Sequence, residues 1–206
     1  MRRICVVTAD GRSYYAIVSK LRGAGLPFLS LLPEDDPREC GLVITTRREA
    51  DSFSAPTISL EELDENPDVA RGQILARLTE GEGTMVLGID PGSRIGAVAF
   101  LGETRLASRT FNSKRSAVAW LNRLVERVPS KRLLIKLGDG EPKTAMWLAD
   151  SLTSSLPMAT IEMVDESGTS RSGSARGLRK DQGSAARIAF RRGVLFRKRD
   201  GGSRSR

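Results

Sequence analysis

The chain has 206 residues, of which 39% are apolar and 5% aromatic, and it contains two cysteines and no histidine. This length suffices for one full domain and a smaller one. The missing histidine excludes Ser-His-Asp and Cys-His nucleophiles, and together with the low cysteine number it excludes the common zinc sites. Any catalysis must therefore use carboxylates, lysine, arginine or hydroxyl groups.

The net charge of +8 is distributed unevenly. Residues 1–80 carry 10 Lys or Arg against 13 Asp or Glu, whereas residues 167–206 carry 12 against 2. Clustered basic side chains gain affinity for phosphates by releasing counterions, so we expect the C-terminal part to bind DNA or RNA. The alternative is a basic tail that only keeps the chain soluble.

No apolar run reaches the roughly 20 residues of a membrane span, and the first residues lead into a strand rather than a signal peptide. We therefore expect a cytoplasmic protein without a membrane partner. In that reducing compartment Cys5 and Cys40 are expected to be two buried free thiols rather than a disulfide.

The first 80 residues alternate strand, helix and strand patterns, which predicts a small parallel α/β (Rossmann-like) domain. We expect strands at residues 2–8, 27–31 and 41–45 and helices at 12–22 and 69–78. Residues 80–83 combine two glycines with charges and predict a hinge. The role of this domain stays open; its negative charge favours protein contact or a homodimer.

Residues 81–195 predict a second domain, followed by a basic, disordered tail at 196–206. The expected strands are two runs within 86–100, then 104–111, 132–137 and 159–164. The expected helices begin near Ser113, Pro142 and Asp181. Three antiparallel strands followed by helix, strand, helix, strand and helix is the order of the ribonuclease H-like fold, with a mixed five-stranded sheet flanked by helices.

Asp90 ends the first strand of this domain, immediately before the turn formed by Pro91 and Gly92. In one interpretation the carboxylate bonds to its own turn. In the other it is a metal ligand at the sheet edge, because a carboxylate beside a buried strand is costly unless a charge meets it.

Further acids follow the other strands that should end at the same edge. Asp139 and Glu141 follow the fourth strand, Asp165 and Glu166 follow the fifth, and Asp181 begins the last helix. Converging carboxylates repel one another and are stable together only with divalent cations between them. Two such cations would activate water and stabilise an in-line phosphodiester displacement.

Four segments resemble the YqgF family of RuvC-like nucleases, which have the Holliday junction resolvase fold. They are Gly88-Ile-Asp90-Pro-Gly-Ser-Arg-Ile-Gly96, Gly138-Asp-Gly140, Asp165-Glu-Ser-Gly-Thr-Ser170 and Lys180-Asp-Gln-Gly-Ser-Ala-Ala-Arg-Ile188. The resemblance covers residues 85–193. It implies Mg²⁺- or Mn²⁺-dependent cleavage of branched DNA or precursor ribosomal RNA, with Asp90, Asp165 or Glu166, and Asp181 as the acids.

Six basic residues are predicted to contact nucleic acid: Arg94, Lys136, Arg171, Arg176, Arg179 and Lys180. Two departures from the family pattern bear on activity. Ser167 stands where a basic residue usually follows the Asp-Glu pair, and Lys136 stands where a small residue is usual. Lys136 would either neutralise substrate phosphate or replace a cation in an inactive relative.

Three functions remain open. The first is a metal-dependent endonuclease, with Asp90, Asp165 and Asp181 on the metal and Glu166 assisting. The second is a catalytically inactive nucleic-acid-binding module on the same fold. The third, half of an actin-like or sugar-kinase-like ATPase, is disfavoured because such enzymes need two copies of the fold.

Overall fold

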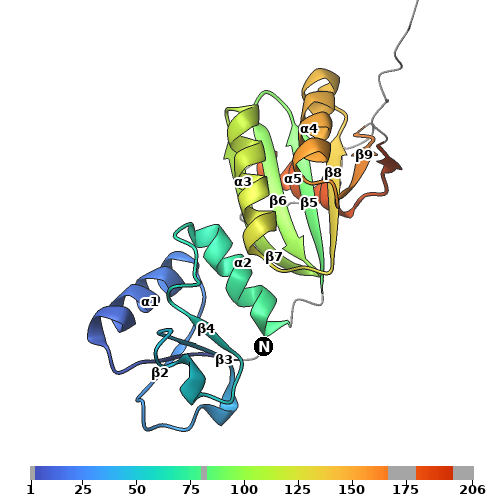
Figure 1. Ribbon diagram of the computed structural model, residues 1–206. Helices are drawn as coiled ribbons and strands as arrows, with labels where there is room; N and C mark the ends of the chain where they lie inside the picture. The colour runs from blue at the N-terminus through green and yellow to red at the C-terminus, as the bar shows by residue number, and fades with distance from the viewer. Residues whose placement is uncertain (1–2, 80–82, 167–179, 197–206) are drawn as a thin grey trace, which may run out of the picture. The chain divides into compact units, whose positions relative to one another are not determined.

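A computed structural model describes residues 3–79, 83–166 and 180–196, with only the backbone of Lys180 and Asp181 (Figure 1). The chain divides into two compact units. The first is Met1–Gly83 with Arg123–Lys131, and the second is Thr84–Asn122 with Arg132–Arg206. Among the described residues, no helix has the length and apolar character needed to cross a membrane.

The first unit is built on a parallel sheet with the order β2-β1-β3-β4. Its strands are β1 (Arg3–Val7), β2 (Leu29–Leu31), β3 (Cys40–Thr45) and β4 (Thr57–Ser59). Helix α1 (Gly11–Gly23) packs against β1 and β3, and α2 (Pro67–Leu78) packs against β3 and α1. The parallel α/β unit predicted from the sequence is confirmed. Strand β4 was not predicted, because Thr57-Ile-Ser59 contains a single apolar residue and shows no apolar pattern.

Side chains at both helix starts satisfy main-chain amides that have no partner within the helix. Asp10 precedes α1 and accepts a hydrogen bond from the Ser13 amide at 3.0 Å. Asn66 does the same for Asp68 before α2, where Pro67 occupies the first turn. Two short 3-10 turns, Pro37–Glu39 and Ala50–Ser52, precede β3 and β4.

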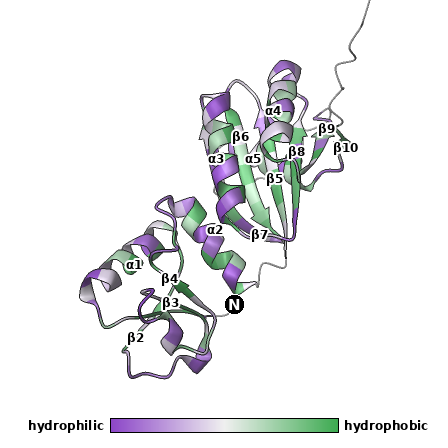
Figure 2. Ribbon diagram, viewed as in Figure 1, coloured by the Kyte–Doolittle hydropathy of each residue, from purple (hydrophilic) through white to green (hydrophobic). Residues whose placement is uncertain are grey.

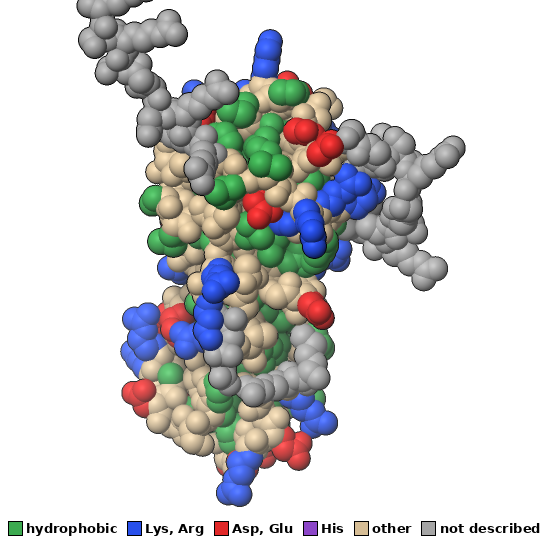
Figure 3. Space-filling view, turned by 90° about the vertical axis from the view of Figure 1, so that its right-hand side faces the viewer, with side chains coloured by type: hydrophobic (Ala, Val, Ile, Leu, Met, Phe, Trp, Pro, Cys, Tyr) green, Lys and Arg blue, Asp and Glu red, His purple; other side chains and the backbone are tan. Residues whose placement is uncertain are grey.

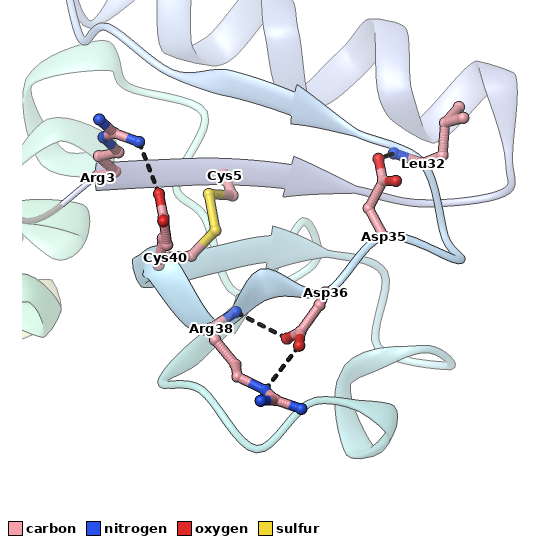
Figure 4. Close-up of a disulfide and its surroundings, with 8 residues drawn as sticks. Arg3, Cys5, Leu32, Asp35, Asp36, Arg38 and Cys40 are labelled. Atoms are coloured by element: carbon pink, nitrogen blue, oxygen red, sulfur yellow. Dashed lines mark hydrogen bonds and ion pairs between the residues drawn. A yellow bond between two sulfur atoms is a disulfide. The ribbon is translucent and has the colours of Figure 1, made fainter.

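Cys5 and Cys40 form a disulfide (Figure 4), so the prediction of two free thiols was wrong. Cys5 lies in β1 and Cys40 begins β3, which is the neighbouring strand, and the two Cα atoms are 5.9 Å apart. That separation lies within the range a disulfide spans. Both sulfurs are buried in an apolar cluster with Val7 and Val43. The strand pairing that creates this proximity is not visible in the cysteine spacing.

The second unit contains a mixed sheet with the order β10-β9-β8-β5-β6-β7. Strands β5 (Thr84–Pro91), β6 (Ile95–Leu101) and β7 (Thr104–Phe111) form an antiparallel meander. Strand β8 (Arg132–Gly138) is parallel to β5, and β9 (Thr160–Val164) is parallel to β8. This arrangement is consistent with the predicted ribonuclease H-like fold. A sixth strand, β10 (Val194–Leu195), adds to β9 as a two-residue antiparallel edge that the sequence did not predict.

Helices cover both faces of this sheet (Figure 1). α3 (Lys114–Arg127) and α4 (Pro142–Ser155) lie on one face, and α5 (Lys180–Phe190) lies on the other. The central strands are hydrophobic, whereas the helices carry polar residues along their outer sides (Figure 2). Gly88 permits α5 to approach, because a Cβ there would lie only 2.7 Å from the Ala189 Cβ. The close contact fixes α5 across β5 and β6.

Candidate active site

The carboxyl ends of β5, β8 and β9 meet at one edge of the second sheet. Ile89 of β5 pairs with Leu137 of β8, and Gly138 of β8 pairs with Val164 of β9. Each strand is followed, or ended, by an acid. Asp90 is the penultimate residue of β5, Asp139 follows β8, and Asp165 and Glu166 follow β9. The parallel pairing therefore gathers acids that are 76 positions apart in sequence.

Glu166 is held above the end of β8 by two hydrogen bonds. Its Oε1 accepts from the Gly140 amide at 3.1 Å, and its own amide donates to Asp139 Oδ1 at 3.0 Å. Gly138 leaves the space for this carboxylate, because a Cβ there would overlap Oε1 and lie 2.7 Å from Cδ. The glycines around Asp139 therefore position the carboxylate that follows β9.

Burial raises the pKa of Glu166, and the negative charges of Asp90 and Asp139 raise it further. The Gly140 amide and the Arg191 guanidinium act in the opposite direction on the same pKa but do not outweigh these effects. Three carboxylates thus interact electrostatically at the edge. Their mutual repulsion makes the site favourable for a cation or a proton.

Asp90 lies partly buried in the hairpin between β5 and β6, where it pairs with Gly96. Strand β5 continues through Pro91, one residue beyond the expected end, and Gly92 begins the bend. A Cβ on Gly92 would lie 3.6 Å from Asp90 Oδ1, which is ordinary contact. The exposed Arg94 occupies the same bend.

The two acids after β9 differ in position. Asp165 is exposed, and its main-chain carbonyl accepts a hydrogen bond from the Arg191 guanidinium at 2.9 Å. Glu166 is partly buried, and its carboxylate interacts with Asp90 and Asp139. Of the two, Glu166 is therefore the stronger candidate for a shared site with Asp90. The sequence did not point to Arg191, which belongs to no motif.

Lys136 is buried beneath the candidate site, two residues before Gly138 in β8. Its ammonium donates to the Arg191 carbonyl, just beyond the end of α5, and lies 3.5 Å from Glu162 Oε2. A cation is favourable at a helix C-terminus because main-chain carbonyls there lack amide partners. These contacts give a structural role to the lysine at position 136, where the resemblance to the YqgF family predicts a small residue.

Glu141 caps α4. Its side chain accepts from the Thr144 amide at 2.8 Å. The hydrogen bond with the Thr144 side chain lowers the pKa of Glu141 most, followed by the bond with the Thr144 amide and by smaller effects of the nearby Lys114 and Lys143. The pattern is that of a helix N-cap. Glu141 thus begins the helix, whereas Asp139 faces Glu166.

Several predicted site residues lie outside the described part of the chain. Arg171, Arg176 and Arg179 belong to residues 167–179, and the side chains of Lys180 and Asp181 are likewise not described. The backbone of Asp181 lies in the first turn of α5. Within the described residues, no group of three Asp, Glu, Cys or His side chains is arranged to hold a metal ion.

The first unit has a cavity of about 560 Å³ at the carboxyl ends of β1 and β3. Glu49 is fixed at its wall. Its Oε2 accepts from the hydroxyls of Thr46 at 2.6 Å and Thr8 at 2.7 Å, and its Oε1 accepts from the Ala9 amide at 2.8 Å. Burial acts to raise the pKa of Glu49, but these hydrogen bonds, with another from Thr45, lower it to about 2. The carboxylate therefore joins two strand ends that are distant in sequence.

Comparison with known proteins bears mainly on the first unit. Residues 3–78 match a family described as the response regulator receiver-like domain, and this match spans β1 to α2. The first unit is thus similar to a receiver domain, while the match leaves the second unit uncovered. No curated protein matches the chain.

One solved structure was found, the crystal structure of Marinitoga piezophila Argonaute in complex with 5′ OH guide RNA. The alignment covers 80% of this chain and 39% of the Argonaute chain, with 9% sequence identity and a TM-score of 0.28. A likeness of that size supports no conclusion about fold or activity.

Proposed function

We propose that the second unit is an endonuclease that hydrolyses phosphodiester bonds of structured nucleic acid with Mg²⁺ or Mn²⁺. One observation carries the proposal: Asp90, Asp139 and Glu166 interact at the edge where β5, β8 and β9 end. The ribonuclease H-like strand order and the motif resemblance to the YqgF family support it. The net charge of the segment from residue 167 onward supports a polyanionic substrate.

The chemistry of the donor set fits a hard divalent cation. Carboxylate oxygens are the ligands that Mg²⁺ prefers. Burial, and after it the charges of Asp90 and Asp139, raises the pKa of Glu166, and a bound cation would favour its ionised form. Asp90 and Glu166 would hold the metal, with Asp181 as the third acid and Asp165 as the alternative to Glu166. When bound, the metal would activate a water molecule and stabilise the developing charge on the phosphate oxygens.

The remaining residues would position these acids and the substrate. Asp139 orients the Glu166 main chain through its accepted hydrogen bond, and Gly138 leaves room for the Glu166 carboxylate. Arg191 anchors the Asp165 carbonyl at the same edge. Arg94, with Arg171, Arg176, Arg179 and Lys180, would bind the phosphates, whereas the protein contacts of Lys136 make it a weaker candidate for that role.

A second candidate function is a nucleic-acid-binding module without catalysis. The observation in its favour is that the described residues include no three-ligand group for a metal. This function predicts binding that weakens with salt and is indifferent to EDTA, without cleavage of any substrate.

Asp90→Asn tests the proposal. The full chain is titrated with Mg²⁺ and Mn²⁺ on a Holliday junction and on a folded RNA side by side, with cleavage and binding measured separately. We expect metal-dependent cutting of one substrate, its loss by at least about 100-fold in Asp90→Asn, and unchanged binding. Glu103→Gln is the matched control, because Glu103 lies exposed in the turn between β6 and β7, at the opposite edge of the sheet. Asp90→Asn that cuts as fast as the wild type would refute the assignment.

A further inference from the structure

The starts of α3 and α4 carry an exposed basic and aromatic surface, which we name the Trp147 patch: Lys114, Lys143 and Trp147. Lys143 and Trp147 are four residues apart on α4 and therefore share one helical face. Lys114, the first residue of α3, places its ammonium 5.1 Å from the centre of the Trp147 ring. All three side chains are exposed to solvent.

The exposure of Trp147 is not required by packing. The opposite side of α4 supplies the core contacts through Ala145, Leu148 and Leu152, which are fully buried. Trp147 remains 36% exposed, whereas the other tryptophan, Trp120, is 6% exposed and packs on Phe111. An indole left at the surface beside two lysines has the composition of a nucleic-acid contact. On the face of the molecule drawn in Figure 3, exposed hydrophobic side chains lie next to basic and acidic ones.

The Trp147 patch lies beside the candidate active site. Helix α4 begins two residues after Gly140, whose amide bonds to Glu166. Lys114 and Lys143 both lie close enough to the α4 cap, Glu141, to lower its pKa, after the larger effect of the Thr144 hydrogen bonds. Trp147 follows Glu141 by six residues, or about 9 Å of helix. A strand bound at the acids would therefore reach the patch within a few nucleotides.

We propose that the Trp147 patch binds the single-stranded segment that flanks the bond to be cut. An unpaired base would stack on the indole, and Lys114 and Lys143 would contact the adjoining phosphates. The cation over the indole occupies one face of the ring, so the base would use the other. The Glu141 carboxylate is engaged by the Thr144 amide, which limits its repulsion of phosphate. The inference rests on the proposed function for its substrate, but it concerns binding rather than catalysis.

The test is a fluorescence titration of the full chain with single-stranded oligothymidylate in EDTA. Stacking on Trp147 should quench the exposed tryptophan, whereas the buried Trp120 keeps its emission. Trp147→Phe should abolish the quenching while the chain remains folded. Trp147→Ala should weaken binding roughly 5- to 100-fold. The double variant Lys114→Ala and Lys143→Ala should lower the magnitude of the salt slope by about 1.4, the value for two contacts to a single strand. Arg105→Ala changes an exposed residue of β7 and should alter neither the affinity nor the salt slope.

The outcomes separate this inference from the proposed nuclease. If the wild type cleaves in Mg²⁺ but its fluorescence is not quenched and Trp147→Ala binds as tightly, the proposal for the Trp147 patch is refuted and the proposed nuclease stands. If the wild-type fluorescence is quenched and Trp147→Ala binds more weakly, but no metal supports cleavage, the proposed nuclease is refuted and the proposal for the Trp147 patch is supported. A chain that binds no single strand in EDTA overturns the patch, whether or not it cuts a folded substrate.

Discussion

Glu49→Gln in the first unit should lower its stability by roughly 2 to 3 kcal/mol at pH 7. The pKa of Glu49 is about 2 in the folded protein against an ordinary 4.5, and one unit of pKa corresponds to about 1.4 kcal/mol. The upper value is therefore about 3.5 kcal/mol, and it is reduced because solvent reaches part of the side chain. Glutamine also turns an amide donor toward the Thr8 and Thr46 hydroxyls or the Ala9 amide, where the carboxylate accepts.

The stability difference between wild type and Glu49→Gln should also change with pH in one direction. A carboxylate whose folded pKa lies below the unfolded value stabilises the fold above the unfolded pKa, and this contribution disappears as pH falls through the folded pKa. The stability difference between wild type and Glu49→Gln should therefore be full above about pH 5 and should shrink steadily toward pH 2.

Urea unfolding followed by circular dichroism from pH 7 down to pH 3 measures this difference. Glu34→Gln is the matched control, because Glu34 is exposed, and it should unfold like the wild type at each pH. Two results would contradict the reasoning: a Glu49→Gln protein within about 0.5 kcal/mol of wild type at pH 7, or a difference that stays constant as pH falls.

Three further predictions concern stability. Reduction of the Cys5–Cys40 disulfide, whose cysteines are 35 residues apart, should lower the free energy of unfolding by up to about 4 kcal/mol. Urea unfolding with and without dithiothreitol measures this loss, and coincident unfolding curves would show that the disulfide does not stabilise the fold. Lys136→Met should cost about 1–3 kcal/mol, because it leaves the Arg191 carbonyl without its donor; an unchanged melting temperature would exclude that role. The pKa of Glu166 is raised by burial, so its carboxyl favours folding below its ordinary pKa, and that contribution is lost as pH rises through the raised value. Glu166→Gln should therefore gain stability relative to wild type as pH rises above the ordinary pKa of 4.5, and melting profiles that stay parallel with pH would disprove it.

Local patterns in the sequence predicted most of the elements. The apolar runs of β5, β6 and β8 and the stripe of α3 carry their own periodicity, which is why they were found. Strands β4 and β10 were missed because a single apolar residue in β4 and a two-residue β10 give no pattern, and both are defined by hydrogen bonds to a neighbouring strand.

The candidate site was predictable in outline, because strand order implies that the acids after β5, β8 and β9 share an edge. Their ranking was not. That the Glu166 carboxylate lies close enough to Asp90 to interact with it depends on the Gly140 amide and on the space above Gly138. The position of Trp147 beside Lys114 likewise depends on two helices that start together at this edge.

By itself, the sequence determined the two α/β units, the order of their elements, the absence of histidine chemistry and the acids available to the second unit. Only the tertiary structure decided that Cys5 meets Cys40, that Lys136 supports the end of α5, and that Glu49 joins the ends of β1 and β3. The reason is physical. Periodicity and turn residues act over a few positions of the chain, whereas these contacts join residues 35 to 55 positions apart and form only when the strands have paired.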